Sequence, residues 1–326
     1  MRAVVCSALG EPETLNIETL PSPPLGAAQV RILVHAAGVN FADGLMVGGT
    51  YQEKPPLPFT PGFEVAGVVA EVGADVTDLA AGDRVIGLTG VGGYADEAVV
   101  EAEAVYKIPD MMGFEAAAGF PIAYGTSHGA LDWRADLKPG ETLLVLGAAG
   151  GVGLTAVEIG HAMGANVIAA ASSPEKLAVA KSRGAAHLID TSSEDLRARV
   201  KDLTQGRGVD VVYDPVGGDL FDAALRVTAW EGRIVIIGFA GGKVPQIPAN
   251  LLLVKNCSAI GFYWGSYRAK SPARVRASFE TLLGWVAQGK LRPHVSERFP
   301  LEDAAKAIRV LQSRKATGKV VLTTGR

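Results

Sequence analysis

The clearest chemistry in the sequence lies in a glycine-rich stretch at residues 143–153. It follows the pattern G-x-G-x-x-G, with Ala148 at the first place, Gly150 at the second and Gly153 at the third. Glycine at the second place lets the backbone approach a pyrophosphate, and glycine at the third lets a helix pack closely on the preceding strand. The helix N-terminus that follows offers N–H groups and a positive dipole end to an anion. The stretch therefore predicts a binding site for a phosphate-bearing dinucleotide.

A second group, Ser172, Ser173 and Lys176, indicates which dinucleotide is preferred. It follows an expected strand at residues 166–171, where a carboxylate would hold the ribose 2′-hydroxyl of NAD and repel the additional phosphate of NADP. No acid stands at that strand tip, whereas the serines can donate hydrogen bonds and Lys176 can supply charge to a 2′-phosphate. The group therefore favours NADPH over NADH. Serine before Pro174 is also typical of a helix N-cap, and the two roles are compatible.

These residues need strands and helices to position them. We expect a β-α-β unit made of a strand at 143–146, a helix from about Val152 toward Met163 and the strand at 166–171. This context makes the glycine pattern specific, whereas a glycine-rich turn alone occurs in many α/β proteins. Strands alternating with helices then continue to about residue 260, with further strands at 188–189, 209–213, 233–237 and 258–262. This alternation predicts an α/β fold, a parallel sheet covered by helices on both faces. The apolar last strand would lie at a sheet edge and need a partner, so we expect a homodimer.

The first 118 residues have a different pattern and look all-β. Gly, Asp and Pro separate several short apolar runs, which indicates a barrel or a sandwich with strands at 30–37, 65–73, 83–88 and 93–100. The proline-rich residues 54–61 predict a surface loop, because proline cannot join a central strand. Elsewhere the pattern predicts helices at 114–118, 125–133, 272–288 and 301–313, and a closing strand at 319–322.

Composition restricts the class of protein. The chain has 326 residues, 48% of them hydrophobic and 20% charged, which suits a soluble globular protein of two domains. No apolar run approaches the roughly 18 residues of a membrane helix, so no membrane partner is expected. The N-terminus lacks the apolar core of a signal peptide, which favours the cytoplasm. The net charge of −3 gives no basic field for nucleic acid.

Metal binding finds little support in the sequence. The two cysteines, Cys6 and Cys257, cannot make a four-thiolate zinc site, and both are expected to be core thiols in a reducing compartment. The five histidines are scattered along the chain, and we expect them to be structural or surface residues.

Two further segments, residues 38–43 and 61–67, together with the glycine stretch resemble the medium-chain dehydrogenase/reductase superfamily. The resemblance covers essentially the whole chain. It implies a GroES-like β-barrel catalytic domain at residues 1–118 and 266–326, and a Rossmann NADP-binding domain at residues 119–265.

The resemblance also bears on zinc. Zinc alcohol dehydrogenases of this superfamily have a cysteine ligand where Asn40 stands and a histidine ligand where Phe63 stands. Neither replacement binds zinc well, and the structural four-cysteine lobe of those enzymes is missing as well. The sequence therefore predicts a member that works without a metal.

Within the superfamily the chain is similar to the zinc-less NADPH:quinone oxidoreductases, the zeta-crystallin-like family. The pattern G-x-N-x-x-D…G-x-Y around Asn40 and Tyr51 fits that branch, as do residues 212–218, 236–240 and 315–322. One departure is Thr191, where many relatives carry a tyrosine near the adenosine. The resemblance implies cofactor contacts at Thr126, at the pyrophosphate (Ala149, Gly150, Gly151, Val152, Gly153), at the 2′-phosphate (Ser172, Ser173, Lys176) and on the nicotinamide side (Gly238, Phe239, Ala240, Phe262, Tyr263, Trp264).

The implied reaction asks little of side chains, because a quinone or conjugated carbonyl already accepts hydride from a well-placed nicotinamide. The expected catalytic residues are Asn40, which could polarise the carbonyl, Tyr51, which could donate a proton in place of solvent, and Asp43, which could orient Tyr51. Asp43 could equally be a buried structural acid that satisfies backbone N–H groups. The aromatic residues 263–267 could line a ligand cleft between the domains or serve in packing.

Other functions stay open at this level. An enoyl or alkenal reductase of the same fold, including one acting on acyl-thioesters, would use the same cofactor site. A non-catalytic NADPH-binding protein, as some zeta-crystallin-like relatives are, would bind the cofactor without turnover. RNA binding is disfavoured, because the sequence has no Lys/Arg cluster or aromatic-studded basic sheet.

Overall fold

Contacts along the chain separate two units in the computed structural model, which describes residues 1–326. The first unit comprises Met1–Ile122, Phe279–Ala287 and Pro293–Arg326, and the second comprises Ala123–Ser278 and Gln288–Arg292. The sequence had suggested boundaries after residues 118 and 265. The units change inside two helices instead, α3 (Pro121–His128) and α10 (Pro272–Ala287).

The first unit is built around a seven-stranded sheet in the order β14-β15-β3-β4-β5-β7, with β6 paired to β3. Its strands are β3 (Gln29–Val39), β4 (Glu64–Val72), β5 (Arg84–Leu88), β6 (Glu97–Glu101), β7 (Val105–Lys107), β14 (Val295–Pro300) and β15 (Lys319–Thr323). Neighbours are antiparallel except β14 and β15. A separate sheet pairs β1 (Arg2–Val5) with β2 (Asn16–Thr19). Strands were predicted at the places of β3 to β6 and β15, whereas β1, β2, β7 and β14 were not.

Alternating side chains of β3 build the core of this sheet. Val30, Ile32 and Val34 are fully buried, and between them Arg31 and Leu33 are only partly so. This period of two is what a strand requires when one of its faces is covered. The same core holds Val320 of β15 and Ile308 of the last helix, so both ends of the chain contribute to it.

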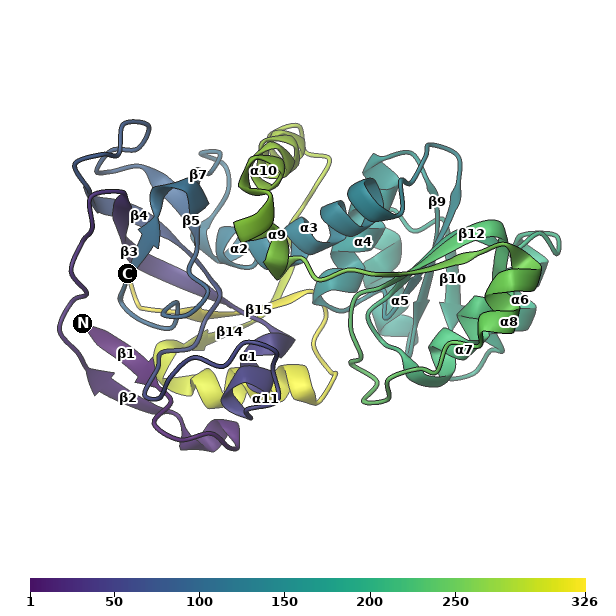
Figure 1. The fold of residues 1–326 in the computed structure, drawn as a ribbon, viewed down its shortest axis with the longest axis horizontal. Helices are drawn as coiled ribbons and strands as arrows, with labels where there is room; N and C mark the ends of the chain where they lie inside the picture. Colours follow the sequence, from purple (N-terminus) through teal and green to yellow (C-terminus); the bar gives the residue numbers. More distant parts are fainter. The chain divides into compact units, whose positions relative to one another are not determined.

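The first unit contains three helices of its own: α1 (Phe41–Val47), α2 (Phe114–Ala118) and α11 (Ala304–Gln312). Three 3-10 turns accompany them, η1 (Pro12–Thr14), η2 (Ala102–Ala104) and η4 (Leu301–Asp303). Helix α1 corrects the expectation that the first 118 residues are all-β. A capping box formed by Asn40 and Asp43 begins this short helix, and α11 lies beside it (Figure 1).

The second unit holds a six-stranded sheet in the order β10-β9-β8-β11-β12-β13. Its strands are β8 (Thr142–Leu146), β9 (Asn166–Ala171), β10 (His187–Asp190), β11 (Val209–Asp214), β12 (Thr228–Ile236) and β13 (Ser258–Gly261). All pairs are parallel, as predicted, and β13 lies at an edge. The strand order reverses between β8 and β11, and ligands bind at such switch points in open α/β sheets.

Helices cover both faces of this sheet, which confirms the predicted α/β fold. They are α4 (Gly151–Ala162), α5 (Pro174–Ser182), α6 (Leu196–Leu203), α7 (Gly218–Val227) and α8 (Ala249–Lys255). Leu144 of β8 faces Val200 of α6 and Phe221 of α7 in one core cluster. The neighbouring Leu143 faces α4, where a Cβ on Gly160 would come within 2.5 Å of its side chain. Figure 1 shows α4 on one side of the sheet and α6, α7 and α8 on the other.

Helix α3 leads into this unit through the π-helical turn η3 (Gly129–Arg134), and α9 (Gly265–Lys270) leads out of it toward α10. No helix of the protein is both long and apolar enough to cross a membrane.

Candidate functional site

The glycine turn joins β8 to α4. Gly147 has a φ of +57°, in the left-handed region that favours glycine. A Cβ on Gly153 would lie 2.1 Å from the carbonyl oxygen of Gly147, so the turn and the helix approach too closely for any side chain there. At Gly150, in contrast, an added Cβ would meet that oxygen at 3.5 Å and nothing nearer. Gly150 is the N-cap of α4 and no side chain caps the helix, so its first-turn N–H groups can receive an anion such as a pyrophosphate.

Buried hydroxyl groups fix α3 to this turn. Ser127 Oγ lies 2.9 Å from the carbonyl oxygen of Val152 and 2.8 Å from Thr155 Oγ1, both at the start of α4. It also lies 2.9 Å from Tyr213 Oη on β11. Thr126, the predicted nicotinamide-side residue, precedes Ser127 and is 9% exposed. The network therefore holds Thr126 in a fixed place relative to the glycine turn.

At the end of β9, Ser173 is the N-cap of α5, and its hydroxyl accepts the backbone N–H of Lys176 at 3.4 Å. The predicted N-cap before Pro174 is confirmed. The Lys176 ammonium donates to Ser172 Oγ at 3.1 Å, so the cation lies at the strand tip. Two hydroxyls and an ammonium therefore gather at the position predicted for a 2′-phosphate.

The loops that follow β8, β11 and β12 lie together. A Cβ on Gly147 would come within 3.0 Å of Val216, which belongs to the loop after β11. The N–H of Ala240, after β12, donates to the carbonyl oxygen of Pro215 at 3.0 Å. Beside it the Phe239 ring is 41% exposed. The predicted residues Gly238, Phe239 and Ala240 therefore lie against the loop after β11, which in turn adjoins the glycine turn where the strand order reverses.

The three aromatic residues after β13 have different surroundings. Phe262 is 7% exposed and its ring lies 6.3 Å from that of Trp133. Trp264 is 4% exposed, and its ring would be 2.6 Å from a Cβ on Gly125. Tyr263 keeps 37% of its surface exposed. Phe262 and Trp264 therefore pack within the second unit, and Tyr263 has the most surface to offer to a ligand.

Helix α1 positions the three residues expected to be catalytic. Asn40 is its N-cap, Asp43 lies in its first turn, and Tyr51 follows its end at Gly48. The Tyr51 N–H donates to the carbonyl oxygen of Leu45 at 3.1 Å, which keeps the tyrosine against the helix. The element missed in the sequence is thus the one that brings these residues into one region.

Asp43 is fully buried and serves the backbone. Its carboxylate accepts the N–H of Asn40 at 2.7 Å and the N–H of Gly62 at 3.2 Å. Burial raises its pKa to about 7, although the hydrogen bond from the Asn40 N–H and the nearby charge of Lys319 favour the ionised form. These contacts are those of the structural acid that the sequence left as an alternative.

Tyr51 belongs to a small apolar cluster with Cys6, Met46, Val47, Phe59 and Phe63. Its ring lies 5.7 Å from that of Phe63 in an edge-to-face geometry, a favourable arrangement for aromatic pairs. Its surface is only partly buried. The hydroxyl of Tyr51 is therefore carried on a ring whose position is set by packing.

The Asn40 side chain is held by two charged residues that were not singled out in the sequence. Its Nδ2 donates to Glu64 Oε1 at 2.8 Å, and its Oδ1 accepts from Lys319 Nζ at 2.7 Å. The ammonium and the carboxylate are 2.9 Å apart, and both residues are buried. One sequence signal could have drawn attention to each residue, although not to their pairing: each is a charge at the first position of a largely apolar strand, β4 or β15.

Zinc does not fit the positions where the superfamily's zinc enzymes bind it. Asn40 is already bonded to the buried ammonium of Lys319, which would repel a divalent cation. Phe63 lies in the apolar cluster around Tyr51. No group of three or more His, Cys, Asp or Glu side chains able to hold a metal ion is formed anywhere in the chain.

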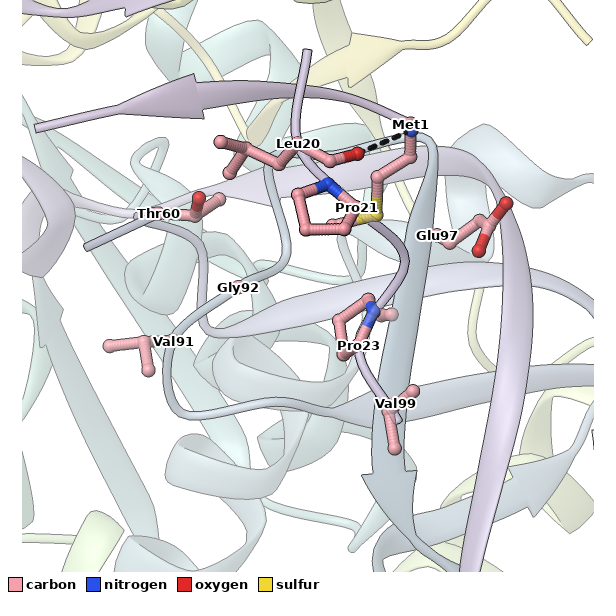
Figure 2. A pocket seen from close by; sticks show the side chains of 10 residues that line it. Met1, Leu20, Pro21, Pro23, Thr60, Val91, Gly92, Glu97 and Val99 are labelled. Atoms are coloured by element: carbon pink, nitrogen blue, oxygen red, sulfur yellow. Dashed lines mark hydrogen bonds between the residues drawn. The ribbon is translucent and has the colours of Figure 1, made fainter. Parts of the chain in front are cut away.

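A separate hollow of about 450 Å³ lies on the first unit (Figure 2). Leu20, Pro21, Pro23 and Val91 give it mostly apolar walls, and Glu97 lies at its rim. The Met1 amino group donates to the carbonyl oxygen of Leu20 at 2.8 Å there. None of the predicted site residues lines this hollow.

Comparisons with known proteins agree with this geometry. The family model of the alcohol dehydrogenase GroES-like domain matches residues 26–110, and that of the zinc-binding dehydrogenases matches residues 151–288. Quinone oxidoreductase-like protein 2 of Rattus norvegicus is 45% identical over 323 residues, covering 99% of this chain and 92% of its own. A quinone oxidoreductase of Pseudomonas aeruginosa is 37% identical over 318 residues, covering 97% of each chain.

Among solved structures, the Escherichia coli quinone oxidoreductase complexed with NADPH superimposes with a TM-score of 0.92 at 29% identity, covering 99% of this chain and 100% of its own. The first unit thus corresponds to the GroES-like fold and the second to the Rossmann fold. The chain belongs to the medium-chain dehydrogenase/reductase superfamily of oxidoreductases, in its zinc-less quinone oxidoreductase branch.

Proposed function

We propose that the protein is an NADPH-dependent reductase that transfers hydride from the nicotinamide to quinones or related conjugated carbonyls without zinc. The observation that carries the cofactor assignment is the Lys176 ammonium held by Ser172 at the tip of β9. A 2′-phosphate placed there gains a charge-assisted hydrogen bond, whereas the unphosphorylated ribose of NADH gains less. The NADPH complex of the similar Escherichia coli enzyme supports the same choice.

The second unit would bind the cofactor along the carboxyl ends of its strands. The N-terminus of α4, from Gly150 to Gly153, would receive the pyrophosphate, and the β9 tip the 2′-phosphate. Thr126, Phe239 and Tyr263 would contact the nicotinamide side. Phe262 and Trp264, which pack internally, would support that surface from behind.

The first unit would present polar groups to the acceptor. Bound NADPH supplies the hydride, and a quinone or enone is electrophilic enough to take it once the two are held face to face. Negative charge then develops on the acceptor oxygen. Asn40 and Tyr51 carry N–H and O–H groups that can stabilise this charge, and Tyr51 or solvent can supply the proton.

Steady-state kinetics with purified protein test this proposal. We expect NADPH consumption with para-benzoquinone or a naphthoquinone and a lower kcat/KM with NADH. Turnover of enones or enoyl-thioesters with all quinones untouched would replace the quinone assignment with an enoyl or alkenal reductase. Tight NADPH binding with no oxidation by any acceptor would show a non-catalytic protein.

We further propose a homodimer formed through the edge of the second unit's sheet. Strand β13 is the edge strand, and the preceding helix α8 exposes Leu253 (76%) and Val254 (66%). Edge strands and apolar patches of this kind are normally covered by another chain. Light scattering should report twice the chain mass at micromolar concentration. The double variant Leu253→Glu with Val254→Glu should show a lower mass, closer to that of one chain. A parent protein that is monomeric would contradict the proposal.

A further inference from the structure

The Asn40 amide has only one chemically consistent orientation. A carboxylate can only accept hydrogen bonds and an ammonium can only donate them. Glu64 Oε1 must therefore face the amide nitrogen, at 2.8 Å, and Lys319 Nζ must face the amide oxygen, at 2.7 Å. Without these two charges the amide could rotate by half a turn and exchange its donor for its acceptor.

One hydrogen-bond donor among Asn40, Glu64 and Lys319 has no partner within the protein. The three N–H groups of Lys319 donate to the carbonyl oxygen of Val39 at 3.0 Å, to Asn40 Oδ1 and to Glu64 Oε1. The other carboxylate oxygen of Glu64 accepts the N–H of Ile122 at 2.7 Å. All three donors of the ammonium are thus used within the protein, and the carboxylate has no donor to offer. The second N–H of Asn40 Nδ2 is the one donor of this network left over for a ligand.

The network has little freedom to move. A Cβ on Gly38 would come within 2.3 Å of Glu64 Oε1, so the carboxylate is pressed against the backbone of β3. A Cβ on Gly119 would lie 2.9 Å from the Lys319 side chain, which is confined in the same way. Asn40 is 9% exposed and Lys319 6%, whereas Glu64 is fully buried.

Stability alone gives a weak reason for such a pair. Taking two charges out of water costs about as much as their attraction returns, and apolar residues of similar volume often stabilise a fold equally well. Removal of one partner alone is strongly destabilising, because the other charge is then left buried and unpaired. The pair is better explained by the direction it imposes on Asn40.

We propose that Glu64 and Lys319 are positioning residues that aim the free Nδ2–H of Asn40 at the carbonyl oxygen of the electron acceptor. The inference rests on the proposed reductase function and deepens it. Asn40 would be the catalytic residue, since it touches the reacting oxygen, and the ion pair would act only through it. The free N–H selects acceptors with a carbonyl oxygen and stabilises the negative charge that hydride transfer places there.

A thermodynamic cycle tests the proposal. It compares the parent, Asn40→Ala, the neutral pair Glu64→Gln with Lys319→Met, and the triple variant. The neutral pair avoids the unpaired buried charge of a single substitution, and thermal unfolding verifies that it folds. We expect Asn40→Ala to lower kcat for para-benzoquinone roughly 10- to 100-fold, in the range of one charge-assisted hydrogen bond. The neutral pair should lose a similar factor, and the triple variant should be no slower than Asn40→Ala. The NADPH Kd should stay within about twofold throughout, since the proposed cofactor contacts lie on the other unit.

Three results would overturn the inference while leaving the proposed function intact. In the first, the parent is active and Asn40→Ala leaves its kcat unchanged. In the second, the neutral pair keeps the kcat of the parent. In the third, the kcat of the triple variant falls by the product of the factors lost in Asn40→Ala and in the neutral pair. The last would show that the pair acts independently of Asn40. A parent that binds NADPH and reduces no acceptor would instead overturn the proposed function, and the donor role of Asn40 with it.

Discussion

Gly153 approaches Gly147 so closely that a Cβ on Gly153 would lie 2.1 Å from the Gly147 carbonyl oxygen. The contact is backbone against backbone, so no side-chain adjustment can relieve it. The start of α4 is therefore joined to the end of β8 with no space between them, and the glycine pattern has a steric cause in the fold as well as a cofactor-binding one.

Alanine substitutions should separate these two causes. Gly153→Ala must displace α4 from the turn and should cost about 1–3 kcal/mol of unfolding free energy, as overpacking does. Gly150→Ala should leave stability almost unchanged, because its Cβ would meet protein at 3.5 Å. It should still weaken NADPH binding by roughly tenfold or more, since the methyl occupies the path of the pyrophosphate. Urea unfolding and fluorescence titration of NADPH measure the two effects, and equal stability losses in both variants would contradict this division.

Cofactor preference should depend on Lys176. Lys176→Ala removes the ammonium that lies 3.1 Å from Ser172 Oγ and should weaken NADPH binding about 10- to 100-fold, while NADH binding changes little. Lys181, an exposed residue in the last turn of the same helix, provides the matched control. If the parent binds NADPH and NADH equally well, or if Lys181→Ala has the same effect, the 2′-phosphate assignment is wrong.

Acid–base behaviour should follow Asp43. Its pKa in the folded protein, about 7, lies above the ordinary value of 3.8, so between these values the folded state binds a proton that the unfolded state has released. This contribution to stability is present below the unfolded pKa and is lost as pH rises toward 7. Asp43→Asn cannot ionise, and it also loses one backbone hydrogen bond. The difference in unfolding free energy between Asp43→Asn and the parent should therefore shift in favour of the variant by on the order of 2 kcal/mol from pH 5 to pH 7. This shift does not depend on which protein is more stable at pH 5. If the urea midpoints of the two proteins change with pH in the same way across this range, the raised pKa of Asp43 is excluded.

Removing either hydroxyl of the Ser127–Tyr213 pair should reduce stability, but by different amounts. Ser127→Ala deprives the buried Tyr213 hydroxyl of its partner at 2.9 Å and should cost about 1–3 kcal/mol. Tyr213→Phe removes the hydroxyl itself, and Ser127 keeps Val152 and Thr155 as partners, so we expect only about 1 kcal/mol. The double variant should recover part of the loss seen with Ser127→Ala. Calorimetry of the three variants measures this order, and a larger loss for Tyr213→Phe would reverse the argument.

The sequence predicted best what depends on local pattern. Strand 166–171 and the glycine turn were identified because alternating strands, helices and turn glycines leave marks within short windows. Helix α1 was missed, because seven residues after a long strand carry almost no helical periodicity, and its start depends on a capping box. The N-cap at Ser173 was anticipated, since serine followed by proline is a local signal.

The ion pair could not be found in this way. Glu64 and Lys319 are separated by 255 positions and meet only because β15 pairs with β3, which pairs with β4. Each residue was present in a segment that resembled the family, but a single sequence gives no sign that two distant charges share one buried space. Long-range pairing of strands is the information that local patterns lack.

The position of β15 beside β3 has a consequence for synthesis of the protein. The second unit is made almost entirely from one continuous stretch, Ala123–Ser278, and can begin to fold on the ribosome once that stretch has emerged. The first unit must wait, because its sheet lacks β15 until residues 319–323 have been translated. During that interval Glu64 lies in a nascent sheet without its counter-ion. The position of Asn40, at the end of β3, is therefore fixed by Lys319 only in the last step of synthesis.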